Sequence, residues 1–129
     1  MKSHSNEITI KIQGTGDQYV VYEYFYKCPD SIYLNTVLTN SIGSNCKIIN
    51  IPTEGETTNT VKLVWNDKLQ SLHSMFENLN HLKEADLSHF DSSQVSHMTD
   101  MFYNCTSVTS INFSNFNTSL VEDMRALFF

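Results

Sequence analysis

The feature that most constrains the fold is a stretch of sequence that is written twice. Residues 75–90 read MFENLNHLKEADLSHF, and residues 101–116 read MFYNCTSVTSINFSNF. Nine apolar positions recur at one constant offset: Met75, Phe76, Leu79, Leu82, Ala85, Leu87, Phe90, Val95 and Met98 become Met101, Phe102, Cys105, Val108, Ile111, Phe113, Phe116, Val121 and Met124. A third copy opens at Leu127-Phe128, and a degenerate copy precedes the first. Fixed self-similarity in this range of periods indicates a solenoid, whose units bury their apolar faces against one another.

Each unit combines two periodicities. Glu84, Asp86 and Ser88 alternate with Ala85 and Leu87, as a short strand with one buried face requires. After candidate capping oxygens at 91–93, apolar residues follow at i, i+3, i+6 and i+7, namely Val95, Met98, Met101 and Phe102. The same helical pattern recurs over 67–76 and 119–128. The sequence therefore predicts an α+β fold: a leucine-rich-repeat-like solenoid with one short strand and one short helix per coil.

The first half of the chain predicts a different structure. Ile8, Ile10 and Ile12 alternate with polar residues and indicate a strand. Residues 19–26 fit either a second strand or one face of a helix, and 31–34, 47–51 and 60–65 are further strand candidates around a polar loop over 53–59. We expect a mostly β N-terminal cap over 1–66, shielding a solenoid of two to three coils over 67–129.

The last predicted helix ends in Leu127, Phe128 and Phe129 without a polar capping repeat. An open apolar end favours association. We therefore expect either that the array is truncated here or that these three residues mediate self-association.

The repeats carry a resemblance to a known family. Residues 87–105, LSHFDSSQVSHMTDMFYNC, resemble the BspA-like surface-protein repeat, a leucine-rich-repeat variant whose unit reads roughly LxxLDLSxFDTSxVTxMxxMFxxCxS. The resemblance covers about residues 69–129, and the N-terminal half resembles the leader that precedes such repeats in some members. Leu79 stands where the family has Cys, and Ala85 is smaller than the usual aliphatic, which suggests looser packing there. The resemblance implies a cell-surface or extracellular role in adhesion and protein contact.

Composition and charge exclude several classes of function. The net charge is −6 and the eight Lys and Arg are scattered, so no basic stripe is available to bind nucleic acid. No run of about 18 apolar residues predicts membrane insertion, and the start MKSHSNEITI lacks the apolar stretch of a secretory signal. The three cysteines form neither a disulfide framework nor a zinc pattern. Cys28 and Cys46 are left as either a disulfide or two thiols, and Cys105 is interpreted as a small buried hydrophobe.

No motif predicts a cofactor, a metal site or an active centre. His81, His89 and His97 fall in different parts of one unit and lack a ligand motif. The methionines at 75, 98, 101 and 124 are interpreted as core. Glu84 and Asp86 share one side of a strand, which permits general acid–base chemistry in a hydrolase, but no third group supports it. Asn104, Asn112 and Asn117 begin N-x-S/T sequons that either carry glycans or reflect composition.

The polar strand face is the candidate binding site. The predicted contact strip consists of Glu84, Asp86, Ser88, Ser110, Asn112 and Ser114. Its acidic start favours a basic or polar protein partner, such as a host or cell-surface component; a merely solvated sheet face is the alternative, and a glycan on Asn112 would block the strip. The sequence thus predicts a non-enzymatic interaction and adhesion module at the cell surface. The alternative is an intracellular, cytoplasmic scaffold that self-assembles through its C-terminal coil.

Overall fold

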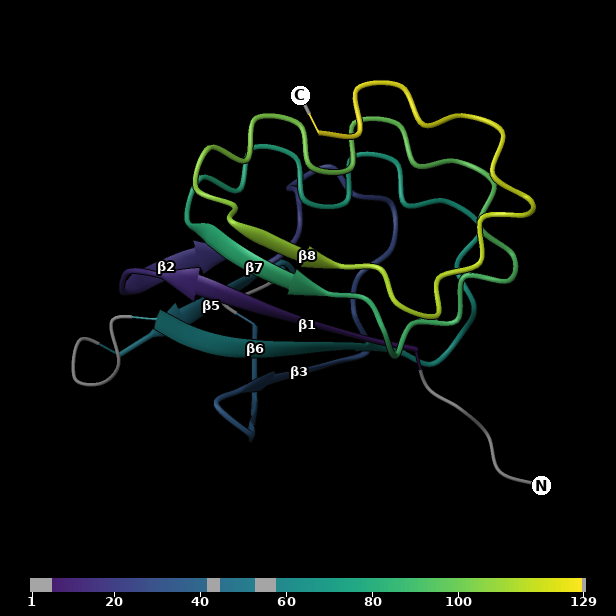
Figure 1. Ribbon diagram of the computed structural model, residues 1–129. Helices are drawn as coiled ribbons and strands as arrows, with labels where there is room; N and C mark the ends of the chain where they lie inside the picture. Colours follow the sequence, from purple (N-terminus) through teal and green to yellow (C-terminus); the bar gives the residue numbers. More distant parts are fainter. Residues whose placement is uncertain (1–5, 42–44, 53–57, 129) are drawn as a thin grey trace.

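The computed structural model describes residues 6–41, 45–52 and 58–128. Over these residues the regular structure consists of strands in two sheets (Figure 1). The larger sheet has the order β4-β3-β6-β1-β7-β8, with bounds β4 (Val37–Thr39), β3 (Ser31–Leu34), β6 (Thr58–Trp65), β1 (Asn6–Gln13), β7 (Leu82–Asp86) and β8 (Ser110–Asn112). The smaller sheet pairs β2 (Gly16–Tyr19) with β5 (Ile48–Ile51). The strand predictions at 8–12, 31–34, 47–51 and 60–65 are confirmed, whereas β2 and β4 were not predicted.

Strand β1 joins the two halves of the chain. It pairs antiparallel with β6 along one edge and with β7, the strand of the first repeat, along the other. Ile8, Ile10 and Ile12 point into the core and are fully buried there. The sheet that begins in the first half therefore continues without a break into the repeats, where β7 and β8 pair in parallel.

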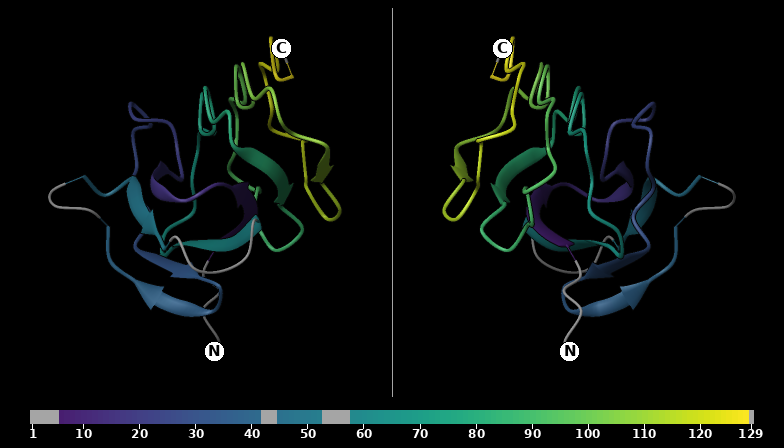
Figure 2. Two further views of the ribbon diagram at one scale, coloured as in Figure 1. Left: turned by 90° about the vertical axis from the view of Figure 1, so that its left-hand side faces the viewer. Right: turned by 90° about the vertical axis from the view of Figure 1, so that its right-hand side faces the viewer.

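The repeats lie on one another as parallel layers. Isolated parallel bridges join Ser71 to His97 and His97 to Asp123, so each bridge connects equivalent positions of successive copies. Figure 2 shows the layers side by side, beyond the curved sheet. Phe76 stacks on Phe102 with ring centroids 5.5 Å apart, and Phe102 stacks on Phe128 at 5.9 Å. The offset between the copies thus corresponds to one layer of the structure.

The predicted α+β leucine-rich-repeat-like solenoid is wrong, because no helix occurs in the described part of the chain. The segments 67–76, 95–102 and 119–128 are successions of turns. In the first of these layers, the amides of Leu72, Ser74, Phe76 and Asn78 donate to the next layer, to the carbonyls of His97, Thr99, Met101 and Tyr103. The amides of Met75, Glu77 and Leu79 donate three residues back, to the carbonyls of Leu72, Ser74 and Phe76, and the His73 amide donates to Ser71 Oγ. In an α-helix every amide donates to the carbonyl four residues before it. The alternating hydrogen bonds of this segment therefore exclude a helix.

Left-handed residues fix the turns. Ser74, Asp100 and Ala126, which are equivalent positions of successive layers, have φ of +59°, +59° and +53°. Asn78 and Asn104 repeat the conformation one turn after the first two, with φ of +65° and +59°. A left-handed residue interrupts a right-handed helix. The apolar i, i+3 spacing that predicted a helix arises instead from turns, in each of which an amide donates to the carbonyl three residues before it.

The second strand or helix predicted over 19–26 is wrong beyond Tyr19, which ends β2, and residues 20–30 form neither element. Val20, Val21 and Phe25 are buried, and the segment runs as bends and turns. The predicted loop at 53–59 lies partly outside the described residues, and its end, from Thr58, belongs to β6. Among the described residues, no helix is long and apolar enough to cross a membrane.

Replacing Ala126 by glycine tests the left-handed position. A Cβ at such a φ costs roughly 1–2 kcal/mol, and glycine avoids that cost while losing some chain entropy. We expect Ala126→Gly to raise the free energy of unfolding by about 1 kcal/mol, measured by urea denaturation.

The matched control is Ala85→Gly. Ala85 is buried in β7 without a left-handed backbone, so the same substitution there should lower stability by about 0.5 kcal/mol or more. Equal effects at the two positions would contradict the turn geometry.

Candidate functional site

The predicted contact strip lies along the parallel pair β7–β8. Glu84 is opposite Ser110 and Asp86 is opposite Asn112, so these four side chains share one side of the sheet. Ser88 and Ser114 follow just beyond the strand ends. The structure therefore brings the six residues together. The strand residues among them lie on the side of the sheet opposite to the buried Ala85.

The strip continues onto strands that the repeat pattern did not include. Lys11 of β1 lies opposite Glu84 on β7 and opposite Thr60 on β6. Thr9 of β1 likewise lies between Asp86 and Lys62. Since opposite residues in a sheet share a side, these positions form two rows that cross the sheet. We call this surface the polar face; it consists of Thr9, Lys11, Tyr33, Thr60, Lys62, Glu84, Asp86, Ser110 and Asn112.

The polar face carries both signs of charge. Acidic side chains stand on β7, and lysines stand on the neighbouring strands β1 and β6. Lys11 and Glu84 are both exposed and directly opposed, an arrangement worth roughly 0.2–1 kcal/mol in a sheet. The acidic start that the repeat alone showed is thus locally offset by lysine. Alternation in 8–12 and 60–64 was the signal that could have found these residues.

A hollow of about 350 Å³ opens in the polar face beside β3. Thr9, Tyr33, Thr36, Thr60 and Lys62 line it. The Lys62 ammonium lies 4.6 Å from the centroid of the Tyr33 ring, within cation–π range. The turn from β3 to β4 contributes Thr36 with φ of +75°, which is unusual for a β-branched residue. Positive φ at both Asn35 and Thr36 is the geometry of the two-residue hairpin turn that joins Leu34 to Val37.

Two acceptors of the strip are used by the chain itself. The Ser88 amide donates to Asp86 Oδ1 at 2.9 Å, and at the equivalent place in the second copy the Ser114 amide donates to Asn112 Oδ1 at 2.9 Å. Hydrogen bonds from Ser88 lower the pKa of Asp86 below its ordinary value. Asp86 therefore stays ionised near neutral pH, which suits an acceptor and not an acid that donates a proton.

The predicted helix caps have the same geometry. The Ser93 amide donates to Asp91 Oδ1 and the Ser119 amide to Asn117 Oδ1. Hydrogen bonds from Ser93 lower the pKa of Asp91. No helix follows either residue in the described part of the chain, so these oxygens close turns instead of capping helices.

The sequon asparagines are exposed in the second copy, where Asn104 lies in a turn, Asn112 at the end of β8 and Asn117 beyond that strand. Asn104 Nδ2 donates to Asn78 Oδ1 at 3.1 Å, which links two layers. Asn112 and Asn117 accept amides through their Oδ1 atoms, as described above. Glycosylation at the three sites stays a prediction.

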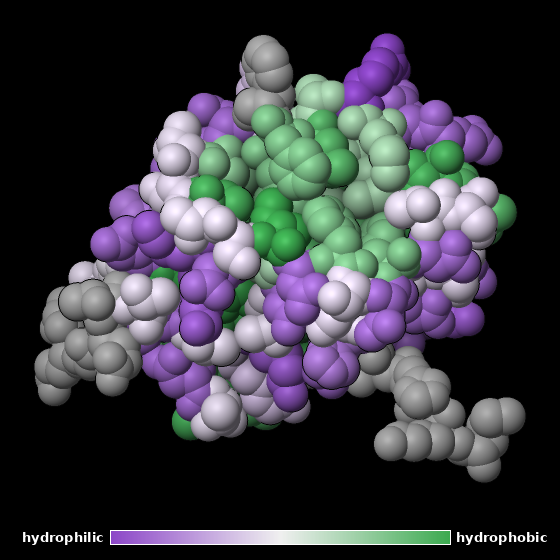
Figure 3. Space-filling view, viewed as in Figure 1, coloured by the Kyte–Doolittle hydropathy of each residue, from purple (hydrophilic) through white to green (hydrophobic). Residues whose placement is uncertain are grey.

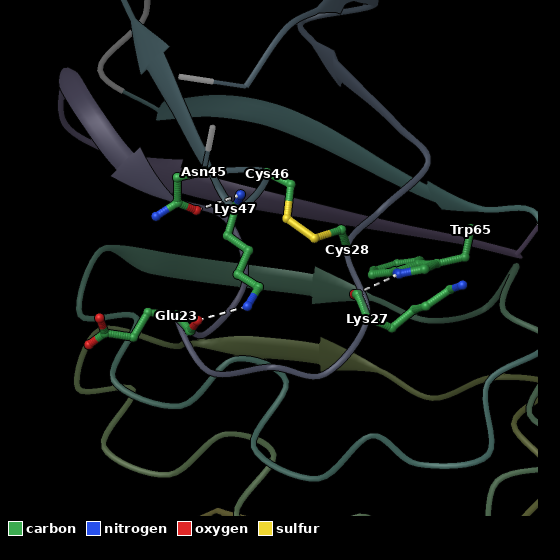
Figure 4. The surroundings of a disulfide bond; sticks show 7 residues. All are labelled: Glu23, Lys27, Cys28, Asn45, Cys46, Lys47 and Trp65. Atoms are coloured by element: carbon green, nitrogen blue, oxygen red, sulfur yellow. Dashed lines mark hydrogen bonds between the residues drawn. A yellow bond between two sulfur atoms is a disulfide. The ribbon is translucent and has the colours of Figure 1, made fainter. Parts of the chain in front are cut away.

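Cys28 and Cys46 form a disulfide, which settles the pairing that the sequence left open. It ties the irregular segment 20–30 to the start of β5 (Figure 4). Cys105 is a free, partly buried thiol whose Sγ donates to the Phe76 carbonyl, and burial raises its pKa to about 11. Its prediction as a small apolar residue of the core agrees with its packing there.

His89 borders the polar face, close enough to Asp86 to contribute to the lowered pKa of that carboxyl. His89 and His97 contact the hydroxyls of their neighbours Ser88 and Ser96. His4 lies outside the described residues. Within the described ranges, no group of three or more His, Cys, Asp or Glu residues is placed to hold a metal ion.

The predicted self-association residues lie at the last layer. Phe128 is 62% exposed and Leu127 is partly buried against the core, while Phe129 lies outside the described residues. A hollow of about 250 Å³ opens between them and is lined by Met98, Phe113, Phe116, Thr118, Met124, Leu127 and Phe128. Figure 3 shows apolar surface gathered over this end of the molecule.

Replacing Asp86 by asparagine tests the turn at the strand end. The folded-state pKa of Asp86 is below its ordinary 3.8, so its contribution to stability is complete above that pH and is lost as the pH falls through the folded-state value. We expect Asp86→Asn, which copies Asn112, to keep stability at pH 7 and to lose less of it during acid titration than the wild type does.

Urea denaturation at pH 7 and at several values below 4 measures both effects. Asp91→Asn, which copies Asn117, is the matched second variant and should reduce the acid sensitivity in the same way. Superimposable pH profiles of the variants and the wild type would contradict the assignment.

Comparison with known proteins gives a family without an activity. No curated protein and no solved structure matches the chain. Residues 53–129 match the model of one family. The matched residues include both copies of the repeat and the strands β6, β7 and β8. This match covers more than half of the chain. The chain therefore belongs to the family described as "Mycoplasma protein of unknown function, DUF285".

Proposed function

We propose that the chain is a non-enzymatic interaction module that binds a protein partner through the polar face. The observation that carries this proposal is the register of five strands, which aligns acidic, basic, hydroxyl and aromatic side chains in two rows. Such a surface offers donors and acceptors of both charges on a rigid sheet. Rigid presentation lowers the entropy cost of binding.

The hollow beside β3 supports the same proposal. It gives the otherwise shallow face a place for a side chain of the partner, with Tyr33 as an aromatic wall and Lys62 as a cation. Tyrosine is enriched at protein interfaces because it combines apolar area with a polar hydroxyl. Adhesion would then depend on β1, β3 and β6 as well as on the repeats.

A location at the cell surface or outside the cell is part of the proposal. Two observations support it: the disulfide between Cys28 and Cys46, and the resemblance of residues 69–129 to BspA-like surface repeats. Structural disulfides form and persist mainly in oxidising compartments.

Charge reversal on the polar face tests the proposal. Glu84→Lys adds a cation to the polar face, which already carries Lys11 and Lys62, and removes the opposite charges of Glu84 and Lys11. We expect this variant to weaken binding to a partner about tenfold or more. The measurement is biolayer interferometry against a panel of purified, immobilised extracellular and cell-surface proteins.

Glu122→Lys is the matched control, because Glu122 is exposed in the last layer and the substitution changes the net charge equally. It should leave binding unchanged. An equal loss in both variants would attribute binding to net charge, and no loss in either would place the contact away from the polar face.

A second candidate function is an intracellular scaffold that self-associates through the last layer. The apolar hollow around Met124 and Phe128 favours it, as do the exposed fractions of 45% for Met124 and 62% for Phe128. Two copies that bury this surface against each other would each remove apolar area from water, which is favourable at roughly 25 cal/mol per Å².

Phe128→Glu tests this candidate. If the surface mediates pairing, light scattering across a concentration range should show dimers of the wild type and monomers of the variant. Val37→Glu, which alters an exposed apolar residue of β4, should leave the dimers intact. A wild type that stays monomeric at all concentrations would contradict self-association.

A further inference from the structure

A second pocket lies between segment 20–30 and the turns of the first layer. Its volume is about 420 Å³, and we call it the tyrosine pocket; it is lined by Tyr22, Tyr24, Tyr26, Gln70, Ser71, His73 and Ser74. Tyr24 and Tyr26 are 75% and 60% exposed. Three tyrosines at alternate positions of one loop exceed the scattered apolar exposure that a folded surface normally shows.

The tyrosine loop is fixed from several sides, although it has no regular structure. The disulfide holds Cys28 to Cys46, and the Lys47 ammonium donates to the Glu23 carbonyl at 2.7 Å (Figure 4). The Trp65 indole donates to the Lys27 carbonyl at 3.2 Å. At the pocket itself, the Tyr22 amide donates to the Met75 carbonyl at 2.7 Å, which binds the loop to the first layer.

The pocket presents crossed rings beside polar groups. Tyr22 and Tyr24 meet edge to face, with centroids 5.5 Å apart and an angle of 79°. Gln70, Ser71, His73 and Ser74 line the same pocket as these two rings. Partial burial and the neighbouring Glu77 carboxylate, to which the hydroxyl donates a hydrogen bond, raise the pKa of Tyr22. The hydroxyl proton of Tyr22 is therefore used within the chain, and Tyr22 offers its ring to the pocket.

We propose that the tyrosine pocket binds a proline-rich segment of a partner protein in the polyproline II conformation. That conformation has no internal hydrogen bonds, so its carbonyls are free to accept from hydroxyl and amide donors such as those of Tyr24 and Gln70. Proline rings pack against aromatic side chains in grooves of this kind. Because both the loop and the peptide are already ordered, little entropy is lost on binding.

The charge around the pocket adds a preference. Glu23 lies exposed on the same loop, and Glu77 lies beside Tyr22. These carboxylates favour a lysine or arginine next to the prolines. A sugar is the competing ligand for an aromatic surface. It would stack on the open face of a single ring, whereas the crossed rings of Tyr22 and Tyr24 favour the ridged shape of a proline helix.

The test is a titration of the isotope-labelled, oxidised chain with a synthetic peptide of nine prolines and one terminal arginine. Amide resonances of residues 22–26 and 70–74 should shift, and those of the polar face should not. Tyr24→Ala should weaken the affinity about tenfold, as expected for an aromatic anchor of an interface. Since Tyr24 is exposed, this variant should fold normally.

Three controls make the test decisive. Tyr103→Ala, which removes a tyrosine of the second copy, should leave the affinity unchanged. A glycine–serine peptide with the same arginine should not bind, and a terminal glutamate in place of the arginine should weaken binding. The proposal is overturned if the polyproline peptide leaves residues 22–26 unshifted, or if maltotriose shifts them and the peptide does not.

Discussion

Strand β1 is hydrogen-bonded along both edges, and the rest of the structure depends on this double pairing. Its partner β6 belongs to the first half of the chain, whereas its partner β7 belongs to the first repeat. Ile8, Ile10 and Ile12 fill the core beneath it. Without β1, the strand of the first repeat would present an unpaired edge, which proteins avoid because it recruits other strands. The same pairing brings Lys11 next to Glu84, so the core and the proposed binding surface share one cause.

The layers beyond β7 are stabilised mainly by repetition. Burial is complete at Met75, Phe76 and Met101, nearly complete at Phe102, and partial at Leu127. Each layer therefore serves as the apolar wall of the one before it, and stability accumulates along the stack. Polar side chains repeat as well: the amide of Asn104 contacts that of Asn78, and paired turns recur at Asp86 and Asn112. Buried contacts and surface turns therefore recur at the same offset along the chain, which is the length of one repeat.

Sequence reasoning found the spacing, most buried positions and most strands, because alternation and self-similarity are local signals. Met124 is an exception, since it was predicted as core and is 45% exposed. It failed where a local pattern has two structural causes. Turns that close every three residues place apolar side chains almost as a helix does, and Ser74, Asp100 and Ala126 are not residue types that announce a left-handed backbone. It also missed Thr9, Lys11 and Lys62, since the pairing of β1 with β7 joins segments from opposite halves of the chain. Likewise, the spacing of Cys28 and Cys46 could not reveal that their Cα atoms lie 5.9 Å apart.

The alternation of backbone amides in the layers has a consequence for how such a chain can change in length. In the first two layers, alternate amides bond to the next layer and most of the others close turns. Inserting or deleting one residue would exchange these two roles for the rest of the layer and shift each buried side chain away from its equivalent in the next layer. Gaining or losing one whole repeat preserves every role. Genetic change in this part of the protein is therefore tolerated in steps of one layer, so the length of the stack can vary while its cross-section stays constant.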